Sequence, residues 1–314
     1  MSEHHHHHDE ANHLASTDTS RLRTVLIIVL AIMVAEVIGG IFSNSLALLG
    51  DAGHMLVDAL ALGLAMFAIT IAKRPATLTR TFGYHRVEIM AALANGVTLV
   101  VLALWIFYEA YQRFLEPPVV KTPLMLLVAT IGLIANLIGM LLLRRASHEQ
   151  LNVKAAFWHI MGDTISSVGV IIGAIIISVT GWYVADPIIA VFIGGIILVG
   201  ATQIVRESAD ILLEAVPKHV QIDEVVGKIK AIPGVEDVHD IHIWTITSQI
   251  HALSAHLLIT DQKVSQSSEI MAAVNQDLAE HFNITHTTLQ LECEKCAVCP
   301  TGFICDISRL ARRI

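Results

Sequence analysis

Two copies of a His-x-x-x-Asp pattern lie inside long apolar stretches of the chain. They are His54 with Asp58, and His159 with Asp163. Side chains four residues apart on a helix share a face, so each pair would direct an imidazole and a carboxylate the same way. Ionisable groups are costly in hydrocarbon and usually face the interior of a helical bundle. If the two helices meet, the pairs offer a tetrahedral set of two nitrogens and two oxygens, which suits zinc and related divalent ions.

Other interpretations of the polar groups in these stretches stay open. Each His and Asp could instead form a private hydrogen-bonded pair that braces its own helix. Asp51, one turn before His54, is either a hydrogen-bond acceptor for that imidazole or a solvated residue near the end of its helix. Interhelical hydrogen bonds or positions at the membrane interface are expected for the remaining polar groups, Glu36, Glu88, Asn95, Glu109 and Asn136.

The composition indicates that helices in a membrane must position the two pairs. The 314 residues are 54% hydrophobic and only 15% charged, a balance typical of membrane proteins. Six apolar stretches approach the length needed to span a bilayer, about 20 residues each. They are approximately 25–42, 46–72, 88–114, 123–143, 155–180 and 187–205. We therefore expect six transmembrane helices within residues 21–206, with the two patterns on the second and the fifth.

The basic residues of the connecting segments predict the orientation of these helices. Only Arg113 and Lys121 fall on one side. The side that holds both chain ends has Arg21, Arg23, Lys73, Arg74, Arg80, Arg86, Arg144, Arg145, Lys154 and Arg206. Both termini are therefore expected in the cytoplasm, with the protein in a bacterial inner membrane. At a rise of about 1.5 Å per residue, Asp58 and His159 reach overlapping depths, so the two pairs can form one site.

Beyond Arg206 the hydropathy falls, and residues 207–292 are expected to form a cytoplasmic domain. Helical spacing occurs at 221–232 and 265–282, and alternating β-branched runs occur at 235–247, 250–260 and 285–292. The order helix, strand, strand, helix, strand predicts a ferredoxin-like α+β domain with two helices on one face of a sheet. Residues 1–20 would form a His-rich tail, and residues 293–314 a Cys-containing tail.

With these features the chain resembles the cation diffusion facilitator family of divalent metal exporters. The segments 45–54 (Ser-Leu-Ala-Leu-Leu-Gly-Asp-Ala-Gly-His) and 238–244 (Val-His-Asp-Ile-His-Ile-Trp) are similar to its zinc-transporting branch. The resemblance implies that His54, Asp58, His159 and Asp163 form the transport site. It also implies a homodimer in membrane lipid that exports Zn²⁺, with Cd²⁺ or Co²⁺ as alternatives, in exchange for protons. Neither enzymatic activity nor a nucleic-acid partner is expected.

Histidines of the cytoplasmic domain predict a second site, where Zn²⁺ would act as a regulatory ligand. His239, His242 and His256 lie on adjoining predicted strands and can converge. By resemblance, His239 and His256 match zinc-binding positions of the family's cytoplasmic domain. The family's last strand normally adds a His and an Asp, where this chain has Gln290 and Glu292, so Glu292 is the remaining ligand of that strand.

Cysteines after the last strand could complete this second site. Cys293 and Cys296 begin a run that continues with Cys299 and Cys305. Such spacing in a reducing compartment favours metal over a disulfide, and thiolates bind zinc well. The alternative is a flexible tail with incidental thiols beside ordinary surface histidines. The run His4 to His8 is either a native metal-capturing tail or the remnant of an expression tag.

Two other classes of function compete with transport. A membrane metalloenzyme is disfavoured because the sequence has no His-Glu-x-x-His segment and because two imidazoles and two carboxylates leave no open position on zinc. A membrane-anchored metal sensor or receptor would use the cytoplasmic His and Cys cluster. The two His–Asp pairs within the membrane would then have no function.

Overall fold

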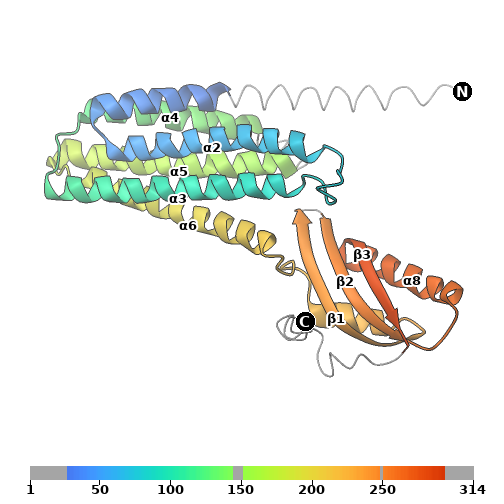
Figure 1. Cartoon of the computed structure of the whole chain (residues 1–314). Helices are drawn as coiled ribbons and strands as arrows, with labels where there is room; N and C mark the ends of the chain where they lie inside the picture. The colour runs from blue at the N-terminus through green and yellow to red at the C-terminus, as the bar shows by residue number, and fades with distance from the viewer. Residues whose placement is uncertain (1–26, 144–150, 248–249, 294–314) are drawn as a thin grey trace, which may run out of the picture. The chain divides into compact units, whose positions relative to one another are not determined.

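The computed structural model describes residues 27–143, 151–247 and 250–293 (Figure 1). The chain divides into two compact units. One holds Met1–Leu64 and Ala94–Val205, and the other holds Ala65–Leu93 and Arg206–Ile314.

Apolar helices build most of the first unit. Among the described residues, five helices are long and apolar enough to cross a membrane. They are α2 (Leu46–Ala72), α3 (Arg86–Leu115), α4 (Thr122–Leu143), α5 (Leu151–Thr180) and α6 (Ala185–Leu212). A shorter apolar helix, Ile27–Ser43, precedes them. The predicted helical membrane region is confirmed, whereas a sixth complete crossing stays a prediction because the described chain begins at Ile27.

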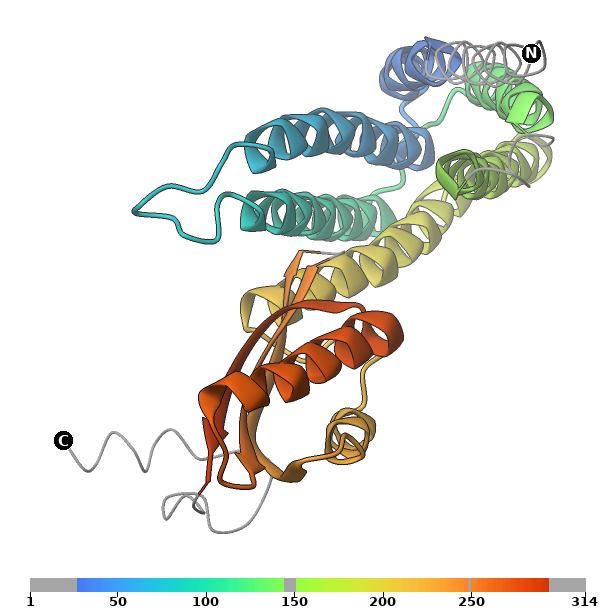
Figure 2. The same ribbon diagram turned by 90° about the vertical axis from the view of Figure 1, so that its right-hand side faces the viewer.

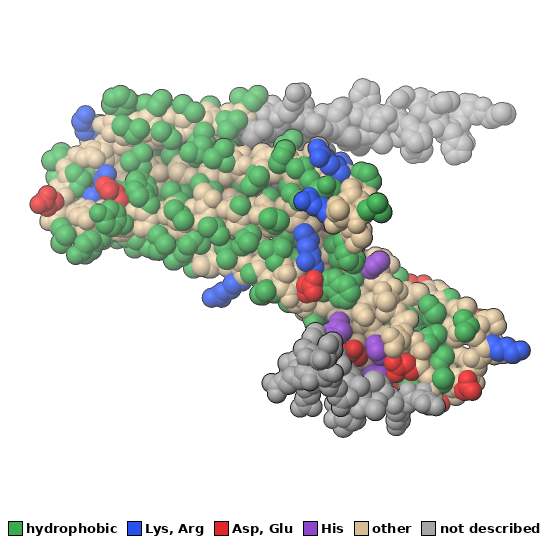
Figure 3. Space-filling model, viewed as in Figure 1, with side chains coloured by type: hydrophobic (Ala, Val, Ile, Leu, Met, Phe, Trp, Pro, Cys, Tyr) green, Lys and Arg blue, Asp and Glu red, His purple; other side chains and the backbone are tan. Residues whose placement is uncertain are grey.

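The helices pack through small and aliphatic side chains and expose large apolar ones. Leu46, Leu99, Ile106 and Met125 lie in one buried cluster, while Trp105 and other large apolar residues are exposed. Figure 3 shows such apolar side chains spread over the visible face of the helices, with Lys, Arg, Asp and Glu near the helix ends. This is the distribution expected of helices whose outer faces contact lipid.

The cytoplasmic domain has the predicted order helix, strand, strand, helix, strand. Its elements are α7 (Ile222–Lys230), β1 (Val235–Thr247), β2 (Ile250–Ile259), α8 (Val264–Phe282) and β3 (Ile284–Glu292). The sheet order is β1-β2-β3, with β1 antiparallel and β3 parallel to β2. The two helices contact each other and pack on the sheet (Figure 2). The α+β fold class is therefore confirmed.

A bulge in β1 decides which of its side chains share a face. His239 pairs with His256, and His242 pairs with Ser254. Three residues along β1 therefore correspond to two residues along β2, which leaves one extra residue in β1. Asp240 accommodates the extra residue with a positive φ of 48°, a conformation that Asp tolerates better than most residues. Consequently His239 and His242 lie on the same side of the sheet, opposite the buried core side chains of Val238, Ile241 and Ile243.

Candidate functional site

The first His-x-x-x-Asp pair is formed on α2. His54 Nε2 lies 3.4 Å from Asp58 Oδ2, and the two side chains are 27% and 23% exposed. An uninterrupted apolar helix places them one turn apart on one face. The pair is thus accessible from a space beside α2 and has nitrogen and oxygen atoms that could bind one ion.

That space is a cavity of about 390 Å³ between helices of the first unit. Asp51, His54 and Asp58 line it from α2, and Asp163 from α5. Its other lining residues are Asn95, Leu99, Gly162, Ser166, Ile193, Ile196, Ile197, Gly200, Ala201 and Ile204. His159 lies on α5 one turn before Asp163, and its side chain falls outside the part of the chain that the structure describes. Three of the four predicted ligands therefore line one cavity.

Buried carboxyl groups cluster at and beside this cavity. Asp51 and Asp163 are each 2% exposed and Glu36 is 1% exposed, and these three groups lie close enough to repel one another. Glu36 reaches a position beside Gly132, where an added Cβ would come within 2.7 Å of its Oε1. Asp51 is therefore buried rather than solvated. Clustered carboxyl groups in a low dielectric make this region attractive to cations.

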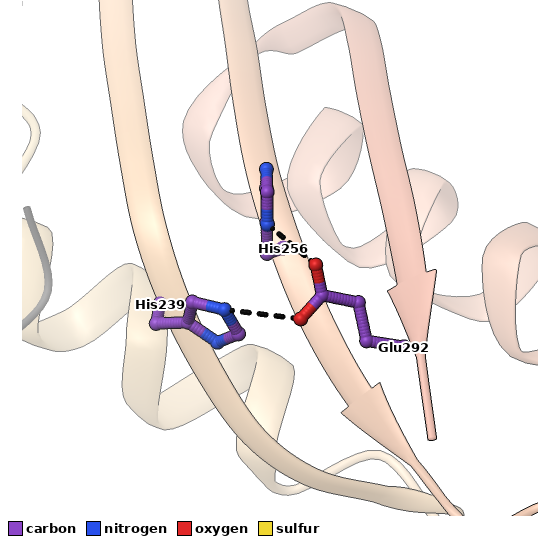
Figure 4. Close-up of side chains that lie close together, drawn as sticks. All are labelled: His239, His256 and Glu292. Carbon is purple, nitrogen blue, oxygen red and sulfur yellow. Dashed lines mark hydrogen bonds and ion pairs between the residues drawn. The ribbon is translucent and has the colours of Figure 1, made fainter. Parts of the chain in front are cut away.

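Three strands of the cytoplasmic domain supply the second cluster. His239 of β1, His256 of β2 and Glu292 of β3 each offer a ligand atom, and these atoms all lie within 4.8 Å of one another. His256 Nδ1 is 2.8 Å from Glu292 Oε1, and His239 Nε2 is 3.2 Å from Glu292 Oε2 (Figure 4). Sheet register explains the arrangement, because His256 pairs with His239 on one side and with Gln290 on the other, and Glu292 follows Gln290 on the same face.

The donor atoms of this cluster fit a metal ion. His239 Nε2 and Glu292 Oε2 are both buried and face each other at 3.2 Å, but neither makes a well-directed hydrogen bond within the described residues. Buried polar atoms usually find a partner, and imidazole nitrogen and carboxylate oxygen are common zinc ligands. His239, His256 and Glu292 would hold such an ion as three of its ligands.

The other predicted members of the second cluster lie around this group. His242 Nε2 is 3.1 Å from Asp240 Oδ1, and Asp240 Oδ2 is 3.8 Å from His256 Nε2. Asp240 thus joins His242 to the group, a role that the sequence analysis missed because it depends on the bulge. Cys293 is exposed just after β3, and Cys296 lies outside the described residues. The visible face in Figure 3 gathers several His side chains beside Asp and Glu on this domain.

Gln290 approaches the same carboxylate from within β3. Its Nε2 donates a hydrogen bond of 2.8 Å to Glu292 Oε1, the oxygen that also faces His256. An amide donor here steadies Glu292 but adds little as a metal ligand. The fourth position of a zinc ion at this cluster would thus need another group. Asp240, whose Oδ2 lies 3.8 Å from His256 Nε2, and Cys293, which follows β3 directly, are candidates among the described residues.

Both parts of the chain match models of known protein domains. Residues 22–213 match the cation efflux transmembrane domain, and residues 217–294 match the cation efflux protein, cytoplasmic domain. Together the two matches cover most of the chain.

Curated relatives cover nearly the whole chain. The metal cation efflux system protein CzcD of Cupriavidus metallidurans is 45% identical over 275 residues, which are 88% of this chain and 87% of the relative. The cadmium, cobalt and zinc/H(+)-K(+) antiporter of Bacillus subtilis is 38% identical, covering 90% of this chain and 92% of the relative. The zinc transporter ZitB of Escherichia coli is 38% identical, covering 84% of each.

A solved structure, the metal-bound C-terminal domain of the CzcD transporter, is 41% identical, covers 23% of this chain and 99% of that chain, and has a TM-score of 0.22. The domain matches and the curated relatives point to one class of metal cation efflux proteins, which are transporters rather than enzymes. The chain therefore belongs to the cation efflux family, the cation diffusion facilitators that its motifs resemble.

Proposed function

We propose that this protein exports Zn²⁺ from the cytoplasm, with Cd²⁺ and Co²⁺ as related cargo, in exchange for protons. The observation that carries the proposal is that one cavity is lined by His54, Asp58 and Asp163. His159 precedes Asp163 by four residues on α5, and we propose it as the fourth ligand. The names of relatives support the choice of cargo, since they mention zinc, cadmium and cobalt. The name of the Bacillus subtilis relative also mentions H(+) and K(+) as counter-ions.

The ligand chemistry explains why metal and protons would exclude each other. Zinc requires a neutral imidazole and an ionised carboxylate. When zinc leaves, the same atoms of His54, Asp58, His159 and Asp163 can accept protons, which lowers the cost of leaving them in the membrane. Net exchange follows if the cavity opens to the cytoplasm when metal binds and to the other side when protons bind.

The cytoplasmic cluster is proposed to bind Zn²⁺ as a regulatory ligand. His239, His256 and Glu292 come from three neighbouring strands, so a bound ion would tie the far end of β3 to β1 and β2. The name of the family to which the cytoplasmic domain matches refers to a dimer, and we propose a homodimer with six spans per chain. Both termini would lie in the cytoplasm of a bacterium, with the helices in its inner membrane.

Zinc uptake into inverted membrane vesicles tests the proposal. We expect uptake to rise when an acidic interior is imposed and to fall more than about 100-fold in an Asp58→Asn variant, because a neutral amide is a poor zinc ligand. Glu116→Gln, which changes an exposed carboxyl near the end of α3, is the matched control and should transport normally. Uptake that ignores the pH gradient would refute proton exchange.

The same experiment separates transport from metal sensing. The cluster of His239, His256 and Glu292 is the observation that favours a membrane-anchored sensor. If the protein is a sensor, Asp58→Asn should leave zinc uptake by the vesicles unchanged. Zinc binding by the cytoplasmic domain should then still change the conformation of the protein. Loss of uptake with intact cytoplasmic binding supports the exporter.

A further inference from the structure

A carboxylate from α6 caps the beginning of α2. Asp186, the second residue of α6, is completely buried. Its Oδ1 accepts hydrogen bonds from Ser45 Oγ at 2.5 Å and from the Ala47 N–H at 3.3 Å. Its Oδ2 accepts one from the Leu46 N–H at 2.7 Å. The contact joins residues about 140 positions apart in the sequence.

This cap satisfies groups that a helix cannot satisfy by itself. The first four N–H groups of a helix have no acceptor within it, and a negative charge there also complements the helix dipole. Ser45 accepts a hydrogen bond from the Leu48 N–H at 3.2 Å, the usual local form of capping. Asp186 takes the Leu46 and Ala47 N–H groups instead. Because the site is buried, these charge-assisted bonds are stronger than they would be in water.

Arg113 of α3 extends the contact to a third helix. Its Nη1 lies 3.6 Å from Asp186 Oδ2 and donates a hydrogen bond of 2.7 Å to the Asn44 carbonyl. Its Nη2 donates to the Asn44 side chain at 3.3 Å. Asn44 adopts a positive φ of 59° in the tight turn that leads into α2. The buried guanidinium therefore holds both the turn and the capping carboxylate.

The group formed by Ser45, Leu46, Ala47, Arg113 and Asp186, called here the α2 clamp, fixes the position of α2 along its axis. His54 follows Leu46 by eight residues on the same unbroken helix, which places it about 12 Å below the clamp at a rise of about 1.5 Å per residue. A shift of α2 by one residue would move His54 and Asp58 by about 1.5 Å relative to Asp163. Metal–ligand distances tolerate only about 0.2 Å.

We propose that Asp186 is a positioning residue for transport, which acts by holding α2 in place through the clamp. This role rests on the proposed transport function. The clamp sets the height of His54 and Asp58 against the other ligands.

The first test compares Asp186→Asn with Glu109→Gln. The Asp186 change places an amide where Leu46 and Ala47 donate, and it removes the charge beside Arg113. The control removes the negative charge of Glu109, whose Oε1 lies 3.2 Å from Arg113 Nε. It leaves the cap of α2 intact. We expect Asp186→Asn to raise the KM for zinc on the order of tenfold, the usual scale for residues that orient metal ligands, and Glu109→Gln to leave it unchanged.

A purely structural role gives a different result in the same assay. Asp186→Asn would then reduce the amount of protein in the membrane but leave the KM of the inserted molecules at the wild-type value, which would overturn the proposal. If Asp186→Asn does not accumulate, Ser45→Ala removes one of the three bonds and should raise KM by a smaller factor. A normal KM in Ser45→Ala would likewise count against the clamp.

The second test replaces the clamp by a covalent link. In a Ser45→Cys, Asp186→Cys double variant, we expect weakened zinc binding by the full-length protein that recovers after treatment with a short thiol cross-linker. Wild-type protein treated with the same reagent measures any effect on the native cysteines. Zinc binding that stays weak after α2 and α6 are linked would mean that Asp186 does not act by positioning α2, contrary to the proposal.

A failure of the transport function itself is recognised separately. If wild-type vesicles take up no zinc, the proposed function fails, whereas the positioning role is then judged by zinc binding to the full-length protein in calorimetry. Asp186→Asn should still weaken binding at the His54 site on the order of tenfold. Equal affinity in the two proteins would refute the positioning role.

Discussion

The proposed metal sites of the helical region and of the cytoplasmic domain use similar ligands but position them by different means. In the membrane region, His54 and Asp58 come from one helix, so their mutual position follows from four residues of spacing. In the cytoplasmic domain, His239, His256 and Glu292 come from three strands, so their mutual position follows from strand register. On a helix, the spacing in the sequence is enough to bring two ligand side chains together. In a sheet, the ligand side chains come together only after the strands have paired in register.

The two centres also differ in how complete their ligand sets are. The proposed helical site has two His and two Asp residues in the sequences of α2 and α5. The described cytoplasmic cluster has three groups within ligand distance, with Gln290 bonded to the third. We therefore expect the helical site to be essential for transport and the cytoplasmic site to adjust it.

The largest expected effect comes from breaking the helical centre. Asp163→Asn should reduce zinc transport more than about 100-fold because it removes a charged ligand from the buried site. Thr164→Ala is the matched control on α5, since Thr164 is the next residue and bonds to the Ile160 carbonyl within the same helix. Vesicle uptake measures both variants. Near-normal uptake by Asp163→Asn would remove the helical centre from the mechanism.

Breaking the cytoplasmic centre should have a smaller effect on transport. Glu292→Gln removes the charge shared by His239 and His256, so zinc affinity of the cytoplasmic domain should fall by about 10-fold to 100-fold. Calorimetry on full-length protein that also carries Asp163→Asn isolates this binding. Glu236→Gln, an exposed position on β1, serves as the control. Transport loss as large as that of Asp163→Asn would erase the distinction between the two centres.

Adding a ligand to the cytoplasmic centre should sharpen the comparison. Gln290 pairs with His256 in the sheet and already reaches Glu292, so Gln290→His places a fourth donor beside the cluster. We expect zinc to bind about tenfold more tightly, which corresponds to about 1.4 kcal/mol. The same calorimetric assay measures the change. Unaltered affinity would mean that another group already occupies the fourth position.

The smallest predicted effect concerns the pH dependence of the cytoplasmic domain. His251 is 5% exposed, and its ring centroid lies 5.1 Å from that of His219. Burial, followed by repulsion from His219, lowers the pKa of His251 below its ordinary value of 6.5. His251 therefore binds a proton more tightly in the unfolded domain than in the folded one. The stability that neutral His251 contributes to the folded domain is fully present above the ordinary pKa and is lost as pH falls below it.

Limited proteolysis of the full-length protein at a series of pH values checks this sign. The cytoplasmic domain should become easier to cleave as pH falls from about 7.5 to about 5.5, the range in which His titrates. His251→Asn should flatten that dependence, and comparison at each pH cancels changes in the protease. An identical slope in both proteins would show that His251 does not contribute.

Much of the fold was predictable because the relevant signals are local. The alternation of β-branched residues located β1 at Val235–Thr247, and β2 and β3 differ from their predicted ranges by one residue at one end. Helix ends were less accurate. The apolar run of α6 was predicted to stop at residue 205, but the helix continues to Leu212, because a helix can continue through polar residues after it leaves hydrocarbon.

The candidate sites were predictable only where spacing within one element carries the information. The His54–Asp58 pair is visible in the sequence because both residues belong to one helix. Asp240 was missed because its position depends on a bulge, and Asp186 was missed because its partners on α2 lie about 140 residues away. Both depend on how elements pair and pack, which no local pattern encodes.

The capped beginning of α2 bears on how the chain assembles. Amide hydrogens in the first turn of a helix ordinarily exchange quickly with solvent because no helical acceptor protects them. At Leu46 and Ala47 the acceptor arrives with Asp186, after most of the membrane region has been synthesised. Slow exchange at these two amides would therefore mark the moment when α6 has joined the bundle, and a nascent chain that stops before α6 should leave them unprotected.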